Sequence, residues 1–405
     1  MLISITSLLL GIGILLIGHG LFGTLLTLRA ALEGYSNTMI GIIMAAYFGG
    51  YILGTFLAPV LINRIGHIRA FAVTGAIACC LVIFHGLVVN PWVWLMARFI
   101  YGACIVGIYL IIESWLNART SDVWRGRIFA VYMLINLIAM AAGQQLLLVG
   151  SVGQLELFAI AAALFSLSLV PLALTPVPEP ERLKSLSLDL RQLYQTAPLG
   201  MMGCLASGLA GGAFWTLGPL FAHQTGLTDD EVAALMSATI LGGALFQWPV
   251  GHWSDRVDRR KVLAGMSFGA TVFALVTALA PQMPLWYMLI IMFSYGGTYF
   301  AIYPLSVAHS NDRATPEQLI SIGGSLLLSY GIGATLGPLV GGVLMEFVGP
   351  YSLPVFYAAC WLMLGLFALH RIRHVAPVAR EEVERFRPLL RTSPLAIQII
   401  TEKSP

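Results

Sequence analysis

Long stretches of apolar residues without a single charge alternate with short polar connectors along this chain. A run of 18 or more such residues indicates a helix that crosses a membrane, and residues 3–28 form the first such run. This run is longer than the apolar core of a cleaved leader, roughly 7 to 15 residues, so we expect it to be a retained span. The pattern predicts twelve spans, at residues 3–28, 38–62, 70–90, 92–116, 128–150, 155–174, 199–221, 231–251, 262–280, 285–307, 320–344 and 351–370.

These spans predict an all-α integral membrane protein whose helices fall into two groups of six. Two connecting segments are longer than the others, one in the middle of the chain and one after the last span. We therefore expect an amino-terminal six-helix bundle at 1–174, a linker at 175–197, a second six-helix bundle at 198–370 and a tail at 371–405.

The composition narrows the class of protein. Charged residues make up 10% of the chain and apolar residues 58%, whereas a soluble domain has about 25% charged residues. This excludes a soluble enzyme. The five cysteines lie in apolar runs, without the spacing of a disulfide framework or a zinc site. With no phosphate-binding loop and no metalloprotease motif in the sequence, we expect no enzyme activity, cofactor, metal or nucleic-acid partner, and a monomer that contacts the bilayer and a small molecule.

The basic residues lie almost entirely on one side of the predicted topology. Of the 22 Lys and Arg residues, 20 lie in the even-numbered connectors and the tail, and the exceptions are Arg29 and Arg98. Cytoplasmic connectors of membrane proteins are rich in Lys and Arg. We therefore expect the linker, the tail and both termini to be cytoplasmic.

A repeated loop indicates that the two halves are related. The connector after the second span, 63–69, and the connector after the eighth, 255–261, both have basic residues at their second and seventh places. Two groups of six spans with matching loops are typical of a duplicated transporter.

Three motifs carry a resemblance to the major facilitator superfamily. The loop motif G-x-x-x-D-R-x-G-R-R is matched, except that Asp258 replaces a glycine, by Gly251, Asp255, Arg256, Arg259 and Arg260. In the first half, Pro59 and Asn63 replace its glycine and aspartate. The fourth span resembles R-x-x-Q-G-x-G through Arg98 and Gly102, with Tyr101 and Cys104 departing from it. The segments 113–117, 125–127 and 303–305 resemble the YcaD-like bacterial branch.

The third motif lies in the eleventh span and fits the antiporter pattern G-x-x-x-G-P-x-x-G-G, through Gly333, Gly337, Pro338, Gly341 and Gly342. Antiporters of the family have this pattern in the fifth span, so we interpret it here as a helix-packing motif. The resemblance as a whole implies the two-bundle fold of the superfamily, a central site served by alternating access, a gating role for the 251–260 loop and a location in the bacterial inner membrane.

Arg98 is the main candidate for substrate binding. It lies about 12 Å below the outer end of its helix, where a charge costs at least ~2.5 to 3.5 kcal/mol, so it should face protein or a water-filled cavity. Tyr109 and Glu113 share its helical stripe, but Glu113 is about 22 Å away along the axis and cannot pair with it. The partners left open are Asn136, Gln144, a backbone carbonyl, water or substrate, and a purely structural role satisfied by carbonyls is the alternative.

Other candidates are polar or aromatic residues within spans. Glu113 is a candidate for proton coupling, or it could extend toward cytoplasmic arginines. His19 could line the central cavity and couple to protons, or be a satisfied core residue. The remaining cavity candidates, for which packing is the alternative, are Trp215, Gln247, Tyr295, Tyr299 and Tyr303.

These observations predict a secondary-active transporter that moves a small molecule by alternating access, with proton coupling as an option. No carboxylate lies deeper in the predicted spans than Glu113, which favours an anionic or zwitterionic substrate over a cation. The alternatives are a drug or metabolite efflux antiporter and a transporter-like membrane sensor. The sensor would depend on the tail, where the mixed-charge stretch 380–385 is expected to form a short helix.

Overall fold

The computed structural model describes residues 2–120, 122–173, 180, 188–279, 283–315, 317–375 and 386. The amino-terminal bundle consists of α1 (Leu2–Leu32), α2 (Asn37–Ile65), α3 (His67–Leu87), α4 (Pro91–Arg119), α5 (Asp122–Gln145) and α6 (Glu156–Ala173), with a short 3-10 helix η1 (Leu146–Val149) after α5. The carboxy-terminal bundle consists of α8 (Pro198–Gln224), α9 (Asp229–Ser254), α10 (Arg259–Leu279), α11 (Leu285–Asn311), α12 (Leu319–Phe347) and α13 (Ser352–His374). A short helix α7 (Leu190–Thr196) precedes α8.

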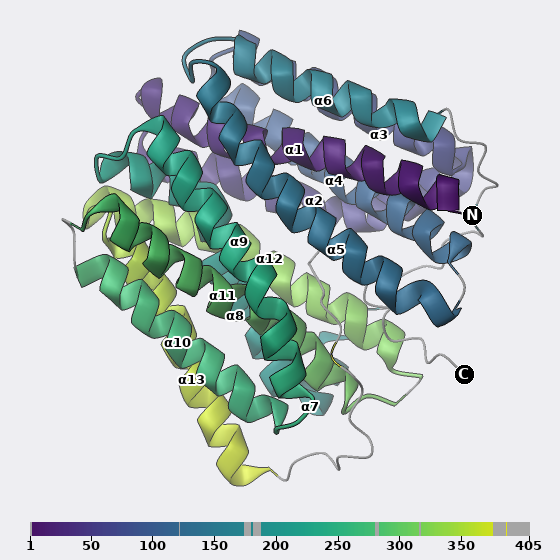
Figure 1. Ribbon diagram of the computed structural model, residues 1–405, viewed down its shortest axis with the longest axis vertical. Coiled ribbons are helices and arrows are strands. Elements are labelled where there is room, and N and C mark those ends of the chain that lie inside the picture. The colour runs from purple at the N-terminus through teal and green to yellow at the C-terminus, as the bar shows by residue number, and fades with distance from the viewer. Residues whose placement is uncertain are drawn as a thin grey trace.

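Each predicted span corresponds to one long helix, which confirms the all-helical membrane fold. Within the described residues, eleven of these helices are long and apolar enough to cross a membrane, and a shorter apolar stretch at Glu156–Pro171 forms most of α6. Figure 1 shows the helices of the amino-terminal bundle beside those of the carboxy-terminal bundle.

Helix ends follow local sequence signals. The Ser36 side chain accepts a hydrogen bond from the Met39 amide at the start of α2, and Asn90 accepts two amides at the start of α4, just before Pro91. Gly66 separates α2 from α3 with φ of 84°, a value that glycine adopts without a steric penalty.

The two ends of the molecule differ, and we name them from what they carry. The closed end carries the connectors 33–36, 88–90 and 225–228, and there the two bundles are joined by direct contacts. The linker end carries the start of α1, α7 and the end of α13 (Figure 1). Hydrogen bonds at the closed end that join the bundles include Thr27 Oγ1 to Thr216 O (2.9 Å), Gln145 Nε2 to Ser237 Oγ (2.7 Å), Ser237 Oγ to Ala141 O (3.0 Å), Gln224 Nε2 to Asn37 Oδ1 (2.7 Å) and Asn37 N to Glu346 Oε2 (2.6 Å).

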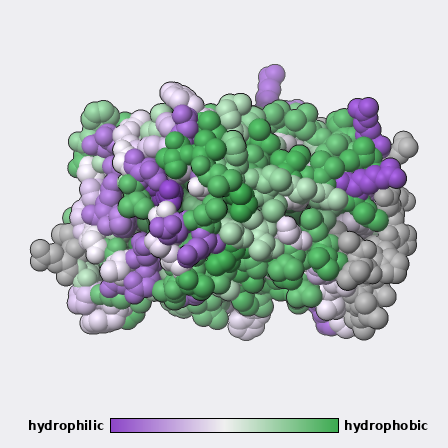
Figure 2. Space-filling model, turned by 90° about the horizontal axis from the view of Figure 1, so that it is seen from above, coloured by the Kyte–Doolittle hydropathy of each residue, from purple (hydrophilic) through white to green (hydrophobic). Residues whose placement is uncertain are grey.

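The outer surface matches a lipid environment. Figure 2 shows hydrophobic residues over most of the middle of one face, with hydrophilic residues gathered toward its ends. Exposed tryptophans lie near both ends, Trp92 and Trp286 toward the closed end and Trp124 and Trp253 toward the linker end. Tryptophan is enriched at both membrane–water interfaces, so these residues mark the borders of the embedded zone.

Within the amino-terminal bundle, a close helix contact positions the main candidate residue. A Cβ atom at Gly102 would lie 2.0 Å from the Tyr47 carbonyl oxygen, so only glycine lets α4 approach α2 this closely. Arg98 is one helical turn from Gly102 on the same face of α4. The contact therefore brings the Arg98 side chain next to Tyr47.

Candidate substrate-binding site

A cavity lies between the two bundles. It is lined by α1, α2, α4 and α5 on one side and by α8, α11 and α12 on the other, with Leu188 of the segment before α7 also at its wall. The empty space among the lining atoms, including open solvent, is about 1260 Å³.

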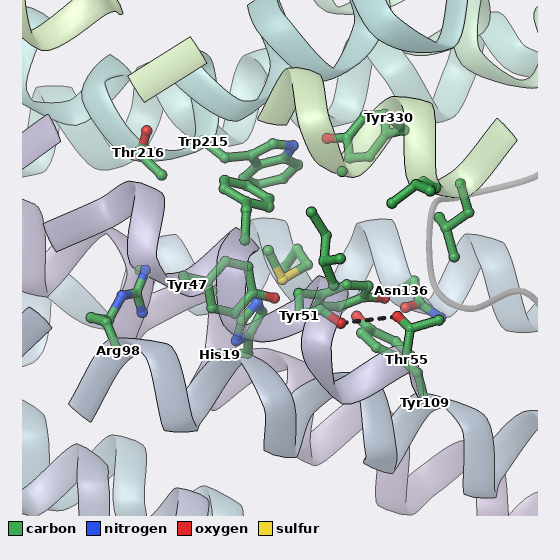
Figure 3. A pocket seen from close by; sticks show the side chains of 18 of the residues that line it. His19, Tyr47, Tyr51, Thr55, Arg98, Tyr109, Asn136, Trp215, Thr216 and Tyr330 are labelled. Atoms are coloured by element: carbon green, nitrogen blue, oxygen red, sulfur yellow. Dashed lines mark hydrogen bonds between the residues drawn. The ribbon is translucent and has the colours of Figure 1, made fainter. Parts of the chain in front are cut away.

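Arg98 lies at one end of this cavity (Figure 3), and its side chain is 4% exposed. Three rings surround its guanidinium group, with centroids 5.0 Å (Tyr47), 5.3 Å (Phe22) and 5.5 Å (Tyr101) from Cζ. Its Nη2 approaches the Met44 sulfur at 3.6 Å, whereas Nε and Nη1 are buried without a hydrogen-bond partner. Among the described residues, no carboxylate forms an ion pair with Arg98.

Neither of the two sequence-predicted partners contacts Arg98, because both are bonded elsewhere. Gln144 accepts a hydrogen bond from Thr24 Oγ1 (2.6 Å) and donates to the Gly20 carbonyl (3.0 Å). Asn136 donates to the Tyr132 carbonyl one turn away, at 2.8 Å. Both side chains still line the cavity.

His19 lines the cavity between Arg98 and the other polar residues (Figure 3). Its Nδ1 lies 2.7 Å from the Tyr101 hydroxyl, and its ring stacks on Tyr101 with centroids 5.8 Å apart. Tyr101 occupies the place where the fourth-span motif has glutamine. This departure from the motif therefore connects His19 to the ring cage around Arg98.

The opposite end of the cavity carries hydroxyl and amide groups from Tyr51, Thr55, Tyr109 and Asn136 (Figure 3). Glu113 is one helical turn beyond Tyr109 on α4 and is fully buried. Its Oε1 accepts a hydrogen bond from the Tyr132 hydroxyl at 3.0 Å. Glu113 is therefore buried beside Tyr132 within the amino-terminal bundle.

The carboxy-terminal bundle contributes mainly apolar and aromatic groups. Trp215, Thr216 and Tyr330 lie across the cavity from the polar side chains of the other bundle (Figure 3), and Phe300 also lines the cavity. Tyr303 is one layer behind, with its ring 5.3 Å from that of Tyr330.

The remaining sequence candidates are in the interior of this bundle. Tyr295 and Tyr299 stack on each other, and Tyr295 accepts a hydrogen bond from Trp361 Nε1 at 3.2 Å. Gln247 is buried on α9. None of these three is among the described residues that line the cavity.

Several lining residues are not among the sequence candidates: Thr24, Tyr47, Tyr51, Thr55, Thr216 and Tyr330. The signal for three of them was present, because Tyr47, Tyr51 and Thr55 recur every four residues and form a polar stripe on an otherwise apolar helix. Tyr101 of the ring cage also has a signal in the sequence, because it lies between Arg98 and Gly102, the two residues that match the fourth-span motif.

The 251–260 loop lies at the linker end and connects α9 to α10. Arg259 bridges Asp312 (3.1 Å) and Asp255 (3.5 Å), and Asp255 also accepts the Phe386 amide at 2.7 Å. Arg260 donates to the Val375 carbonyl at 2.7 Å, which ties the loop to the end of α13. Gly251 is buried against the Phe386 ring, and Arg256 is exposed.

Asp258, which replaces the glycine of the motif, has a structural role at the start of α10. Its carboxylate accepts hydrogen bonds from the Arg260 amide (3.0 Å) and from Arg260 Nη2 (2.6 Å). Burial alone raises the pKa of Asp258, but the hydrogen bonds from Arg260 outweigh it and hold this pKa below its usual value. In this conformation the loop braces the carboxy-terminal bundle, and its role in gating stays a prediction.

The glycine motif of α12 serves two contacts. Cβ atoms at Gly333 and Gly337 would lie 2.3 and 2.1 Å from carbonyl oxygens of α8, so these glycines allow close packing within the bundle. Gly342 faces the Asn37 carbonyl of α2, and the Pro338 carbonyl faces Gly41, so this part of the motif joins the two bundles. Gly341 is near Leu217 and Leu353.

Two further features concern other parts of the chain. His85 of α3 is fully buried, with its ring 5.3 Å from that of Phe22. The short helix expected at 380–385, in the tail on which the sensor alternative depends, lies outside the described residues.

A cavity at the interface of two six-helix bundles, with one buried cation and no enclosed carboxylate among its described lining residues, defines the molecule as a membrane carrier. Comparison with known proteins agrees with this class. The family profile of the Major Facilitator Superfamily matches residues 8–198 and 200–401, and the chain belongs to this family. It is a secondary transporter and a multi-pass membrane protein.

Relatives and solved structures support the same assignment. The chain is 29% identical to the MFS-type transporter YcaD of Escherichia fergusonii over 379 residues, which cover 92% of this chain and 97% of the relative. The YcaD of Shigella flexneri is 28% identical over the same length. The fold is similar to that of the nucleoside transporter NupG (TM-score 0.78, 16% identity, 92% of this chain and 100% of that chain). It is also similar to a bacterial homologue of the lysosomal transporter Spinster in an inward-facing, occupied conformation (TM-score 0.73, 15% identity, 94% and 97%).

Proposed function

We propose that this protein is a carrier of the bacterial inner membrane that binds an anionic small molecule at Arg98 and moves it by alternating access. The observation that carries the proposal is the Arg98 guanidinium, which lines the central cavity with two unpartnered donor nitrogens and no ion-paired carboxylate among the described residues. The ring cage supplies cation–π attraction, but Nε and Nη1 have no hydrogen-bond partner within it.

The energetics favour an anion as the missing partner. A buried cation is costly unless it is paired, and arginine can bind a carboxylate through two parallel hydrogen bonds. Inside a low-dielectric cavity this attraction is stronger than in water. An anionic group that enters the cavity therefore gains the pairing that the protein itself leaves open.

The direction of access follows from the two ends of the molecule. The bundles are joined across the closed end by the Thr27–Thr216, Gln145–Ser237 and Asn37–Glu346 contacts. Leu188, which comes from the segment at the linker end, forms part of the cavity wall. With the termini and linker in the cytoplasm, this conformation is closed to the outside and its cavity communicates with the cytoplasm.

We assign Glu113 as the first candidate for a coupling proton and His19 as the second. Glu113 is buried beside the polar end of the cavity and bonded to Tyr132. His19 lies on the cavity wall, and an imidazole can change its charge near neutral pH. The carrier acts as a monomer with bundles at 1–174 and 198–370, a cytoplasmic linker at 175–197 and a cytoplasmic tail at 371–405.

The orientation is tested with a reporter that is active only in the cytoplasm. We expect activity for fusions after Pro405 and after Leu183, and none after Gly226. Activity after Gly226 would mean that the orientation in the membrane is opposite to the one proposed, and that the cavity opens to the outside.

The transport proposal is tested with purified protein in liposomes. A thermal-shift screen against organic anions, zwitterions and cations identifies a ligand, and its labelled form is then used to measure uptake. We expect an anion to be taken up by the wild type and by Arg29→Gln, a control arginine that already has the Glu33 partner. Arg98→Gln should bind and transport it poorly. Uptake of cations alone, or undiminished uptake by Arg98→Gln, would contradict the proposal.

A further inference from the structure

The polar groups of the cavity are unequally supplied with partners. Gln144, Thr24 and Asn136 are bonded within the amino-terminal bundle, and Thr216 donates to the Gly212 carbonyl at 2.6 Å. Arg98 is different, because two of its nitrogens are buried without a partner. The donor groups that most need a hydrogen-bond acceptor from a ligand therefore belong to Arg98, at one end of the cavity (Figure 3).

The permanent charge on the described part of the cavity wall is positive only. Among the described residues that line it, Arg98 is the one permanent charge, and there is no aspartate or glutamate. Glu113 is directed to Tyr132 instead of the cavity wall. A ligand ammonium group would lose its water without gaining a countercharge, and a second carboxylate would find no second cation.

The remaining wall is suited to a flat apolar body. Tyr47 lies beside Arg98, and Trp215, Phe300 and Tyr330 present rings from the other bundle. The Trp215 and Phe300 rings meet edge to face, with centroids 5.8 Å apart and an interplanar angle of 88°. Aromatic rings bind other rings through offset or edge-to-face contacts, so a planar group is preferred here over a branched polar one.

From these three observations we propose that the substrate is an aromatic monocarboxylate without an ammonium group. Its carboxylate pairs with the guanidinium group of Arg98, and its ring packs between Tyr47 and the wall formed by Trp215 and Phe300. The inference rests on the proposed function, since it uses the same site, but it excludes the zwitterions that the charge of Arg98 alone would allow.

The experiment uses a matched set of probes on the full-length protein in detergent, measured by isothermal titration calorimetry. The reference probe is 3-phenylpropanoate. Phenylalanine adds only an ammonium group, benzylmalonate adds a second carboxylate, 3-phenylpropanamide removes the charge and propanoate removes the ring. We expect each of these four to bind at least 10-fold more weakly than 3-phenylpropanoate.

Each outcome has a separate meaning. Phenylalanine or benzylmalonate that binds as tightly as the reference would overturn the single-charge inference, and equal binding of propanoate would overturn the aromatic one. In both cases anion binding at Arg98 would still stand. Absence of binding by all five probes would overturn the inference as a whole.

Variants separate the inference from the proposed function. Arg98→Gln should abolish the preference for 3-phenylpropanoate over its amide, while Arg29→Gln should keep it. If Arg98→Gln retains the preference, anion binding is located elsewhere and the proposed function fails together with the inference. Thermal unfolding of both variants shows whether a loss of binding reflects a loss of fold.

Discussion

The two bundles have the same number of long helices but contribute differently to the cavity. The amino-terminal bundle supplies the charge and most of the polar groups, with Arg98 and His19 toward one end and Tyr109 and Asn136 at the other. The carboxy-terminal bundle supplies Trp215, Phe300 and a wall of apolar residues from α12, and it keeps most of its tyrosines in its interior.

This difference suggests a division of labour within a duplicated fold. On the proposed function, one bundle recognises the ligand through charge, and the other covers it with apolar surface and provides the glycine contacts that close the cavity at one end. If this is correct, substitutions in the first bundle should change specificity, and substitutions in the second should change affinity or conformation.

The largest expected effect comes from Arg98→Lys, which changes charge recognition by the amino-terminal bundle. Lysine keeps the charge but cannot form two parallel hydrogen bonds with a carboxylate, so ligand affinity should fall by about 1.5 to 3 kcal/mol, or roughly 10- to 150-fold. Calorimetry and liposome uptake measure the loss. Arg29→Lys is the control, and normal uptake by Arg98→Lys would make Arg98 a structural residue.

The next effect concerns Glu113→Gln, which separates recognition from coupling within the same bundle. The amide can still accept the hydrogen bond of Tyr132 but cannot release a proton. We expect the affinity for the ligand to change by less than about 3-fold. A pH gradient should no longer drive accumulation, so the ligand should only equilibrate across the membrane. His19→Gln tests the second candidate in the same assay, and gradient-driven accumulation in both variants would exclude both residues.

Glu346→Gln tests the closing function of the second bundle. The Glu346 carboxylate accepts the Asn37 amide in the first turn of α2, where the helix dipole favours a negative charge. Its loss should destabilise the closed end by about 0.3 to 1 kcal/mol. A cysteine at Thr24, in a background without native cysteines, should then react faster with thiol reagents added from the closed-end side. Glu156→Gln, at an exposed residue of that end, should leave the rate unchanged.

Trp215→Leu tests the covering wall. The substitution keeps an apolar surface but removes an aromatic face worth about 0.5 to 1.5 kcal/mol, so 3-phenylpropanoate should bind roughly 2- to 12-fold more weakly, without a change in the order of the probes. Trp361→Phe is the matched control, because Trp361 is buried and hydrogen-bonded to Tyr295 inside the bundle. A changed order of probes would show that the second bundle also recognises charge.

The smallest effect is expected from Asp255→Asn in the linker-end loop. Asparagine keeps an acceptor for the Phe386 amide and loses the charge that faces Arg259 at 3.5 Å, a partly exposed pair worth at most about 1 kcal/mol. Thiol labelling of a cysteine at Ser325, near the linker end of α12, should change by less than 5-fold. A larger change would indicate that the loop controls access more directly than its contacts in this conformation suggest.

The helices could be predicted from the sequence because each leaves an independent signal. Charge-free runs fix the number of spans, and residues such as Ser36 and Asn90 fix their starts. Arg98 could be selected for a similar reason, since a charge deep in a span always requires an explanation.

The helix faces were harder to predict. Tyr295 and Tyr299 recur at the spacing of a cavity stripe, yet they pack against Trp361 and Tyr357 in the bundle interior. Tyr47 and Tyr51 have the same spacing and line the cavity. The rotation of each helix about its axis distinguishes the two cases, and it depends on close contacts such as Gly102 with Tyr47, which involve residues far apart in the sequence.

Thr216 connects the cavity to the seal in a single residue. Its side chain lies on the cavity wall, while its carbonyl oxygen accepts the Thr27 hydroxyl from the other bundle at 2.9 Å. The cavity wall at Thr216 is thus also part of the contact between the two bundles. A ligand that displaces this wall acts directly on that contact. Binding can therefore influence the separation of the bundles at the closed end without a relay through distant side chains.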